Sequence, residues 1–270
     1  MFGLFKKLSD NPIELYQNIE NGKQEKASFK KLEELTNKGD AGASYFLALC
    51  YVCGKVVNKD RSIFVKYLLK SAEGNYPIAW AKLGESYYYG EGLEQNYKKG
   101  IEYFEKAIAI FDSMNEQDAV KNGVNYGYIT DIHYKLYHCY HDGENGIEKN
   151  LNKAFYHLEK AAEFNPDAYF QLALCYFNGD CTERDYQKAY EGFKTLADLT
   201  PSTHESYYDS VEQRNEQLSG FGEVNYYVGL CFENGYGTKV QLNTAIYWYR
   251  KSAECGNEKA IKRLEELTNG

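Results

Sequence analysis

Apolar and polar positions follow one another along this chain in a pattern that occurs five times. Each copy opens on a short run such as Leu47-Ala48-Leu49-Cys50-Tyr51, in which apolar, small and aromatic residues keep fixed places. The leading residues are Leu47, Leu83, Leu136, Leu172 and Val228, and successive ones are 36, 53, 36 and 56 residues apart. A recurring distance of 36 residues indicates a protein built of stacked repeats.

A second block of apolar residues follows each first block. Its alanine or isoleucine comes 25 residues after the leading residue, or 26 in the third copy, and the aligned residues are Ala72, Ile108, Ala162, Ala197 and Ala253. In both blocks the apolar residues are three or four positions apart, which is the spacing of an amphipathic helix. We therefore expect each repeat to be a helical hairpin.

Glycines and capping residues lie between the two blocks. The glycines that follow the first block, where a left-handed C-cap favours this residue, are Gly54, Gly90, Gly143, Gly179 and Gly235. The residues placed to cap the second helix with a side-chain oxygen are Asp60, Asn96, Asn150 and Asp185. The fifth repeat has Gln241 at this position, and glutamine is a weaker cap.

Small residues recur at one position in each helix of the pair. They are Ala48, Gly84, Ala173 and Gly229 in the first helix, and Gly100, Ala154, Ala189 and Ala245 in the second. Small side chains at a helix crossing allow the two helices to approach closely. Tyr137 interrupts this series in the third repeat, where we expect a wider crossing.

The repeats organise the whole chain, which we interpret as one α-solenoid domain over residues 1–270. Residues 1–38 and 257–270 are expected to form capping helices, because terminal repeats need a polar outer face. The five repeats are assigned to residues 39–74, 75–109, 129–164, 165–198 and 222–256. Two insertions, 110–128 and 199–221, account for the two longer spacings.

The pattern resembles the Sel-one-like repeat (SLR), a relative of the tetratricopeptide repeat. The second repeat matches its first half with Ala79, Leu83, Gly84, Tyr87, Gly90 and Gly92. The fifth repeat matches its second half with Ala245, Trp248, Tyr249, Lys251, Ala253 and Gly256. The resemblance implies an all-α fold, a right-handed α-solenoid of helix-turn-helix repeats that scaffolds protein complexes. It implies no enzymatic activity common to the family.

Charge and hydropathy restrict the classes of partner. The net charge of −8 argues against nucleic acid, whose phosphates require a basic surface, but it suits a basic protein partner. The longest apolar run, Tyr45–Cys53, is shorter than the roughly 18 residues of a membrane span. No apolar stretch follows Lys6 and Lys7, so we expect no secretory signal and a cytoplasmic location.

The seven cysteines are interpreted mainly as packing residues. Cys50, Cys139, Cys175 and Cys231 take the same position in four repeats, and Ser86 takes it in the other. A small buried slot in each repeat explains all five residues, as is usual in a reducing cytosol. Some secreted SLR proteins join two cysteines in each repeat, and Cys175 and Cys181 remain the one pair here that could approach.

Histidines gather in the third repeat, which contains four of the five in the chain: His133, His138, His141 and His157. His138 and His141 are one helical turn apart, a spacing that can chelate a metal ion. However, no His-Glu-x-x-His or paired-cysteine motif accompanies them, and His157 takes a position that other repeats fill with tyrosine or tryptophan. We therefore assign no metal, no cofactor and no catalytic residue.

The best candidate for a functional surface is the inner side of the array, which the first helix of each pair lines in tetratricopeptide-like proteins. Positions two before, two after and five after the leading residue should face this groove. The partner-binding residues expected there are Tyr45, Tyr88, Tyr134, His138, His141, Phe170, Phe177, Tyr226 and Glu233. Aromatic residues dominate interface energetics, although several of these could instead pack against the next repeat.

The two insertions are an alternative site, because insertions in repeat arrays often lie on the binding face. The first contains Asp112, Glu116 and Asp118 against Lys121, and the second contains Glu205, Asp209, Glu212 and Glu216 against Arg214, with Tyr207 and Tyr208 beside them. Both are acidic. They could equally be elongated helices that only change the tilt of the array.

The sequence thus favours a protein-protein interaction scaffold or adaptor that is not an enzyme. A bacterial immunity or antitoxin protein is a sharper version of this interpretation, since such proteins are acidic and match a basic toxin. Two alternatives stay open. One is a small-ligand or β-lactam-binding protein like some cysteine-rich relatives, and the other is a self-associating structural component. The pattern favours no particular oligomeric state.

Overall fold

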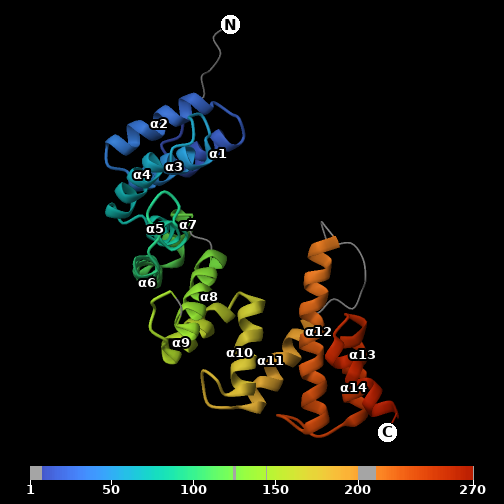
Figure 1. Ribbon diagram of the computed structural model, residues 1–270. Coiled ribbons are helices and arrows are strands. Elements are labelled where there is room, and N and C mark those ends of the chain that lie inside the picture. Colours follow the sequence, from blue (N-terminus) through green and yellow to red (C-terminus); the bar gives the residue numbers. More distant parts are fainter. Residues whose placement is uncertain (1–7, 124–125, 144, 200–210, 270) are drawn as a thin grey trace. The chain divides into compact units, whose positions relative to one another are not determined.

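The computed structural model describes residues 8–123, 126–143, 145–199 and 211–269 (Figure 1). These residues form fourteen helices and no strand, so the predicted all-α fold class is confirmed. The helices before the first repeat are α1 (Pro12–Glu20) and α2 (Glu25–Asn37). They lie within residues 1–38, where the sequence predicts capping helices.

Each repeat is a helical hairpin, as the spacing of the apolar blocks predicts. The five hairpins are α3 (Ala41–Cys53) with α4 (Arg61–Glu73), α5 (Pro77–Tyr89) with α6 (Tyr97–Ser113), α8 (Tyr126–Asp142) with α9 (Leu151–Ala162), α10 (Pro166–Asn178) with α11 (Tyr186–Leu199), and α12 (Val211–Asn234) with α13 (Leu242–Glu254). The short helix α7 (Glu116–Lys121) lies in the first insertion, and α14 (Glu258–Asn269) follows the last repeat.

The predicted caps set the start of the second helices. The side chains of Asp60, Asn96, Asn150 and Asp185 each accept a hydrogen bond from the backbone N–H three residues later, at distances of 2.9 to 3.0 Å. Gln241 makes no side-chain cap at the start of α13, in agreement with its weaker capping chemistry. The first helices end on glycine at positive φ, for example 74° at Gly90.

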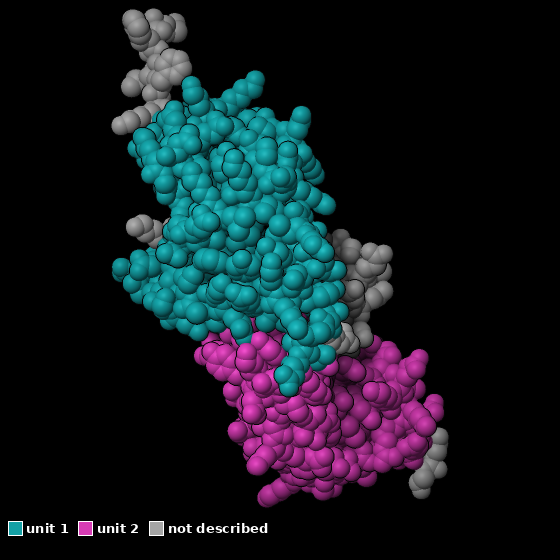
Figure 2. Space-filling model, turned by 60° about the vertical axis from the view of Figure 1, so that its left-hand side comes forward, with its two compact units in different colours: residues 1–132, 143–148 teal, residues 133–142, 149–270 magenta. Residues whose placement is uncertain are grey.

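Contacts between residues divide the chain into two compact units, coloured separately in Figure 2. Unit 1 comprises residues 1–132 and 143–148, and unit 2 comprises residues 133–142 and 149–270. In unit 1 the core lies between the helices, where Leu15, Leu32, Leu47, Leu68 and Leu83 are fully buried. In unit 2 the largest fully buried side chains include Leu136, Leu158, Phe193 and Tyr249.

Small residues allow the paired helices to pack closely, as expected. Gly84 in α5 faces the ring of Phe104 in α6, and a Cβ atom at Gly84 would lie 2.5 Å from that ring. Gly229 in α12 meets the ring of Tyr249 in α13 in the same way, at 2.6 Å. The interior of each of these hairpins therefore has no room for a methyl group at the crossing.

The two insertions lengthen helices. α6 has 17 residues, whereas its counterpart α4 in the first repeat has 13. α12 has 24 residues, so it begins well before the aligned part of its repeat, and Figure 1 shows it longer than α13. Glu205, Tyr207, Tyr208 and Asp209 lie outside the described residues, as do the side chains of Glu116, Lys121, Glu212, Arg214 and Glu216. Within the part of the chain that the structure describes, no helix has the length and apolar character to cross a membrane.

Candidate functional site

In unit 1, the two residues expected to bind a partner have different exposures. Tyr45 on α3 is only 6% exposed, and its ring lies 5.2 Å from the rings of both Phe46 and Tyr76. Burial also raises the pKa of the Tyr45 hydroxyl far above its usual value. Tyr45 is therefore a core residue, which corrects the expectation that it faces a partner. Tyr88 on α5 is half-buried and contacts Tyr97 edge-on at 5.0 Å.

In unit 2, helix α8 presents a first group of aromatic side chains. The rings of Tyr134 and Tyr137 stack at 5.9 Å, and His138 lies 4.8 Å from Tyr134. His141 lies 5.3 Å from Tyr137, and its Nδ1 is 2.8 Å from a carboxylate oxygen of Asp142. We call Tyr134, Tyr137, His138 and His141 the α8 cluster. Its members are three or four residues apart, so one face of the helix carries them all.

A larger group of rings lies between the fourth and fifth repeats, and we call it the six-ring cluster. Its members are Phe170 and Phe177 on α10, Tyr186 and Phe193 on α11, Tyr227 on α12, and Tyr236 in the following turn. Phe177 touches four of the others edge-on, with ring centroids 5.4 to 5.9 Å apart. Such edge-to-face contacts are the preferred arrangement of aromatic pairs.

The turn after α12 is held close to the start of α11, which explains the position of Tyr236. Gly237 has a φ of 66°, and a Cβ atom there would overlap the backbone of Tyr186. Only glycine lets the two backbones approach this closely. The neighbouring Tyr236 then stacks on the ring of Tyr186, at 4.3 Å and 20°. The guanidinium of Arg184 lies over the ring of Tyr186, 5.6 Å from its centroid.

Exposure within the six-ring cluster is graded from the core to the surface. Phe193 is fully buried, and its ring stacks on Tyr227 at 4.9 Å. The other five rings are partly exposed. A surface of this kind offers apolar ring area together with the hydroxyl groups of Tyr186, Tyr227 and Tyr236. Rigid aromatic residues with a polar atom are the side chains most enriched in protein interfaces.

Tyr226 and Glu233, both expected to bind a partner, instead connect the last three helices. Glu233 accepts a hydrogen bond from the Tyr249 hydroxyl at 2.6 Å and pairs with the Arg263 guanidinium of α14. This pairing with Arg263 holds the pKa of the Glu233 carboxyl below its usual value. The Tyr226 ring packs 5.7 Å from Tyr249. The Glu233 carboxylate, which was expected to bind a partner, is thus paired with Arg263 within the protein.

The third-repeat histidines separate into two pairs. His133 on α8 and His157 on α9 are 3% and 5% exposed, and their Nδ1 atoms are 2.9 Å apart. One imidazole must donate and the other must accept, so at least one of the two rings is neutral in the folded protein. His138 and His141 lie apart from them, near Asp142. Neither pair belongs to a group of three or more metal-ligating side chains among the described residues.

Protonation of the buried His133 imidazole should make stability depend on pH. Burial, reinforced by Lys160, lowers the pKa of the His133 imidazole to about 4, whereas the unfolded value is about 6.5. Between about pH 6.5 and pH 4, the His133 imidazole is therefore protonated in the unfolded chain but neutral in the folded protein. The free energy of unfolding falls as the pH drops through this interval. We expect a loss of about 2 kcal/mol in the free energy of unfolding between pH 7 and pH 5.

Urea unfolding at several pH values measures this effect. His133→Gln should be less stable at pH 7 but should flatten the pH dependence above pH 5, because the titrating imidazole is gone. If wild type and His133→Gln lose stability in parallel over this interval, the buried pair is not responsible.

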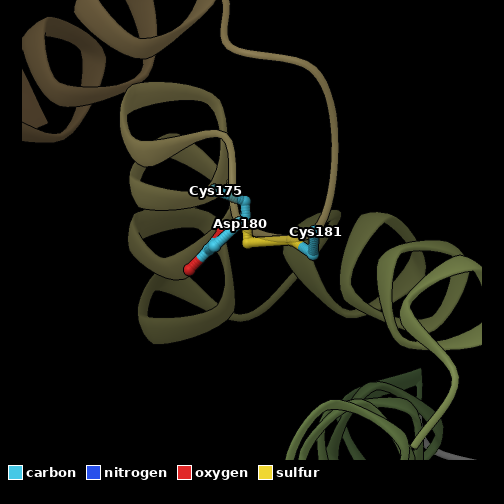
Figure 3. A group of neighbouring side chains, drawn as sticks. All are labelled: Cys175, Asp180 and Cys181. Atoms are coloured by element: carbon cyan, nitrogen blue, oxygen red, sulfur yellow. A yellow bond between two sulfur atoms is a disulfide. The ribbon is translucent and has the colours of Figure 1, made fainter.

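The cysteines agree with the packing interpretation at three of the four aligned positions. Cys50, Cys139 and Cys231 are buried and form no disulfide. Cys175 differs, because it is disulfide-bonded to Cys181 in the turn after α10, with the Cα atoms 5.7 Å apart (Figure 3). The pair that the sequence left open is thus joined, and the packing interpretation does not describe the fourth repeat.

Four members of the six-ring cluster were not found by sequence reasoning: Tyr186, Phe193, Tyr227 and Tyr236. The expected groove positions lie only in the first helix of each repeat, whereas three of these rings come from α11 and from the turn after α12. Tyr236 carries a usable signal, because it is an aromatic residue between Gly235 and Gly237, at a position occupied by Glu91 in the second repeat.

Comparison with known proteins agrees with this architecture. The family model described as Sel1 repeat matches residues 41–76, 78–109, 133–163, 166–198 and 222–257, which is more than half of the chain. A crystal structure of a Sel1 repeat protein from Oxalobacter formigenes is 23% identical, with a TM-score of 0.60, over 96% of this chain and 88% of that one. At this identity the likeness concerns the fold alone.

Two curated fungal relatives also match. Chitin synthase regulatory factor 3 of Schizosaccharomyces pombe is 24% identical over 266 residues, which is 88% of this chain and 26% of that protein. Chitin synthase regulator SKT5 of Malassezia restricta is 26% identical over 205 residues, or 76% of this chain and 12% of that protein. The chain therefore spans only about a quarter of the length of the first relative and about an eighth of the second.

Proposed function

Because this chain belongs to the Sel1 repeat family, we propose that it is a non-enzymatic scaffold that binds another protein through the aromatic surface of unit 2. The observation that carries the proposal is the six-ring cluster, in which three partly exposed rings contact the buried Phe193 and the other two contact Phe177. Interfaces draw most of their binding energy from a few rigid aromatic anchors of this kind.

The cluster is well prepared for binding because its rings are already fixed. Tyr186 begins α11 directly after the N-cap Asp185, and Tyr236 is fixed by the close approach of the Gly237 turn to the backbone of Tyr186. A partner would therefore pay little conformational entropy to order these side chains. Of the partner-binding residues expected from the sequence, Phe170 and Phe177 belong to this proposed surface. The proposed surface also includes Tyr186, Tyr227 and Tyr236.

Three members of the α8 cluster are the second part of the proposed surface, whereas the fourth, Tyr137, is buried. Tyr134, His138 and His141 stay in the set, and His138 is exposed. Asp142 lies beside both histidines, and Asp180 is among the charges that raise the pKa of Tyr137 to about 12, after burial. These carboxylates favour a partner with basic side chains, in keeping with the net charge of −8. In unit 1, Tyr88 is the remaining candidate.

The kind of partner follows from the same chemistry. A basic protein suits the acidic surface, and an immunity or antitoxin role is one form of the proposal. The two fungal relatives are named as regulators of an enzyme, so holding an enzyme is another form. Either role is consistent with the cytoplasmic location that we propose. The acidic insertions are the alternative binding site within this chain.

Affinity purification from the native host tests the proposal. The double variant Phe177→Ala/Tyr236→Ala removes two partly exposed anchors, and we expect it to weaken binding of the retained protein at least ~100-fold. The matched control is Tyr156→Ala/Phe164→Ala, which removes one tyrosine and one phenylalanine that are 44% and 63% exposed elsewhere in unit 2. The control should bind like wild type. Equal retention by both double variants would move the site away from the six-ring cluster.

A further inference from the structure

The turn between α10 and α11 brings three metal-ligating side chains together. Cys175 lies three residues before the end of α10, and Asp180 and Cys181 follow in the turn (Figure 3). The two sulfur atoms and a carboxylate oxygen of Asp180 all lie within 4.8 Å of one another. Among the described residues, no other set of three cysteine, histidine or acidic side chains meets this condition.

This arrangement is specific to the fourth repeat. The residues that correspond to Cys181, six positions after the aligned cysteine or serine, are Val56, Gly92, Asn145 and Gly237. Cys50, Cys139 and Cys231 fill their slots without a second cysteine at this distance. Packing of the repeat therefore does not require Cys181. Where the second and fifth repeats have Gly-x-Gly in the turn, the fourth has Gly179-Asp180-Cys181.

The three side chains have the chemistry of a zinc site. Zn²⁺ prefers thiolate, imidazole and carboxylate ligands in tetrahedral geometry, and three protein ligands leave one position for water. The site lies at the C-terminal end of α10, where the helix dipole favours a positive charge. Within the described residues Asp180 makes no hydrogen bond or ion pair, and it is exposed, so its carboxylate is available and the ion has a path from solvent.

Zinc and the disulfide exclude each other. In a tetrahedral complex with Zn–S bonds of about 2.3 Å, the two sulfur atoms are about 3.8 Å apart, which is too far for an S–S bond. The Cα separation of 5.7 Å leaves room for this change by rotation of the side chains. The turn can therefore hold either the covalent bond or the ion.

We propose that the reduced turn binds one Zn²⁺ ion through Cys175, Cys181 and Asp180, and that the zinc complex and the disulfide are alternative states of this turn. Reduction adds two electrons and two protons to the S–S bond and gives two thiols. A dithiol reductant supplies both and becomes a disulfide itself. Binding of Zn²⁺ then releases the two thiol protons to water. This inference does not depend on the proposed binding of a partner protein.

Metal titration of the full-length protein tests the proposal. The protein is reduced with a phosphine, which takes oxygen from water to form its oxide while the disulfide becomes two thiols, and the reductant is then removed without air. Zn²⁺ is titrated against a chromophoric chelator, and Co²⁺ is used separately to detect thiolate-to-metal charge-transfer absorption. We expect the reduced protein to bind one equivalent and the oxidised protein to bind none.

Four variants separate this site from other thiols. Cys181→Ser should weaken binding at least ~100-fold and Asp180→Asn about tenfold, with loss of the charge-transfer band in the former. Cys53→Ser removes an exposed cysteine in α3 and should leave binding unchanged. Cys175→Ser alters a buried slot, so thermal unfolding is used to check that this variant folds. If Cys175→Ser is unstable, the test rests on Cys181→Ser. Substoichiometric binding by the reduced wild type, or full binding by Cys181→Ser, would overturn the proposal.

Discussion

Replacement of Phe193 by alanine should lower the free energy of unfolding of unit 2 by about 4 kcal/mol, within the 3–5 kcal/mol typical of buried phenylalanines. Phe193 is fully buried, and its ring contacts Phe170, Phe177 and Tyr227 at 4.9 to 5.9 Å. These three residues come from helices on both sides of α11. The variant therefore leaves a cavity that no single neighbouring side chain can fill.

Phe164→Ala is the matched control for this experiment. Phe164 lies in unit 2 but is 63% exposed, so we expect its replacement to change stability by less than about 0.5 kcal/mol. Urea unfolding followed by circular dichroism measures both variants. A cost at Phe193 no larger than that at Phe164 would show that the six-ring cluster has no tightly packed centre. The proposed surface would then lose its rigid support.

Adding a single methyl group at Gly229 should destabilise the last hairpin by about 2 kcal/mol, because overpacking costs 1–3 kcal/mol. The new Cβ atom would lie 2.6 Å from the ring of Tyr249. That ring is fully buried, and its hydroxyl donates a 2.6 Å hydrogen bond to Glu233, so it cannot move away freely. The steric cost thus exceeds the gain of up to about 1 kcal/mol in helix propensity when alanine replaces glycine.

The same helix provides a control with the opposite sign. Among the described residues, a Cβ atom at Gly220 in α12 meets no atom beyond its own helix backbone within 4 Å. Gly220→Ala should therefore stabilise the protein by about 0.5–1 kcal/mol through helix propensity alone. Thermal unfolding of the two variants compares them directly. Stabilisation by Gly229→Ala would mean that the α12 and α13 helices do not approach each other as closely as the structure shows.

The fold was predictable because its determinants are local and repeated. The spacing of the apolar residues predicts the hairpins. The starts of the second helices are predicted by their capping residues, Asp60, Asn96, Asn150 and Asp185. The small residues at Gly84 and Gly229 indicated close crossings, and both glycines face aromatic rings there. Each of these signals acts within one repeat, where sequence separation is short and the register is fixed.

The candidate site was less predictable because it depends on contacts between repeats. It also depends on whether an expected binding residue is already covered or paired by another residue of the same chain. Tyr45 and Glu233 hold positions that could face a groove, but Tyr76 covers the first and Arg263 neutralises the second. Tyr236 joins the six-ring cluster only because Gly237 allows its turn to touch Tyr186. Cys181 follows Cys175 at the distance of a turn, and this spacing is visible in the sequence. The spacing does not by itself establish the disulfide bond that the structure contains.

Photo-cross-linking in the native host is the most direct test of the central claim, that the six-ring cluster binds a partner protein. A photoreactive phenylalanine derivative is placed at Tyr236 in one variant and at Tyr156 in another, since Tyr156 is an exposed tyrosine of unit 2 outside this cluster. We expect the variant at position 236 to form an adduct with one protein and the variant at position 156 to form none. An adduct formed only from position 156, or a partner that co-purifies without cross-linking to position 236, would contradict it.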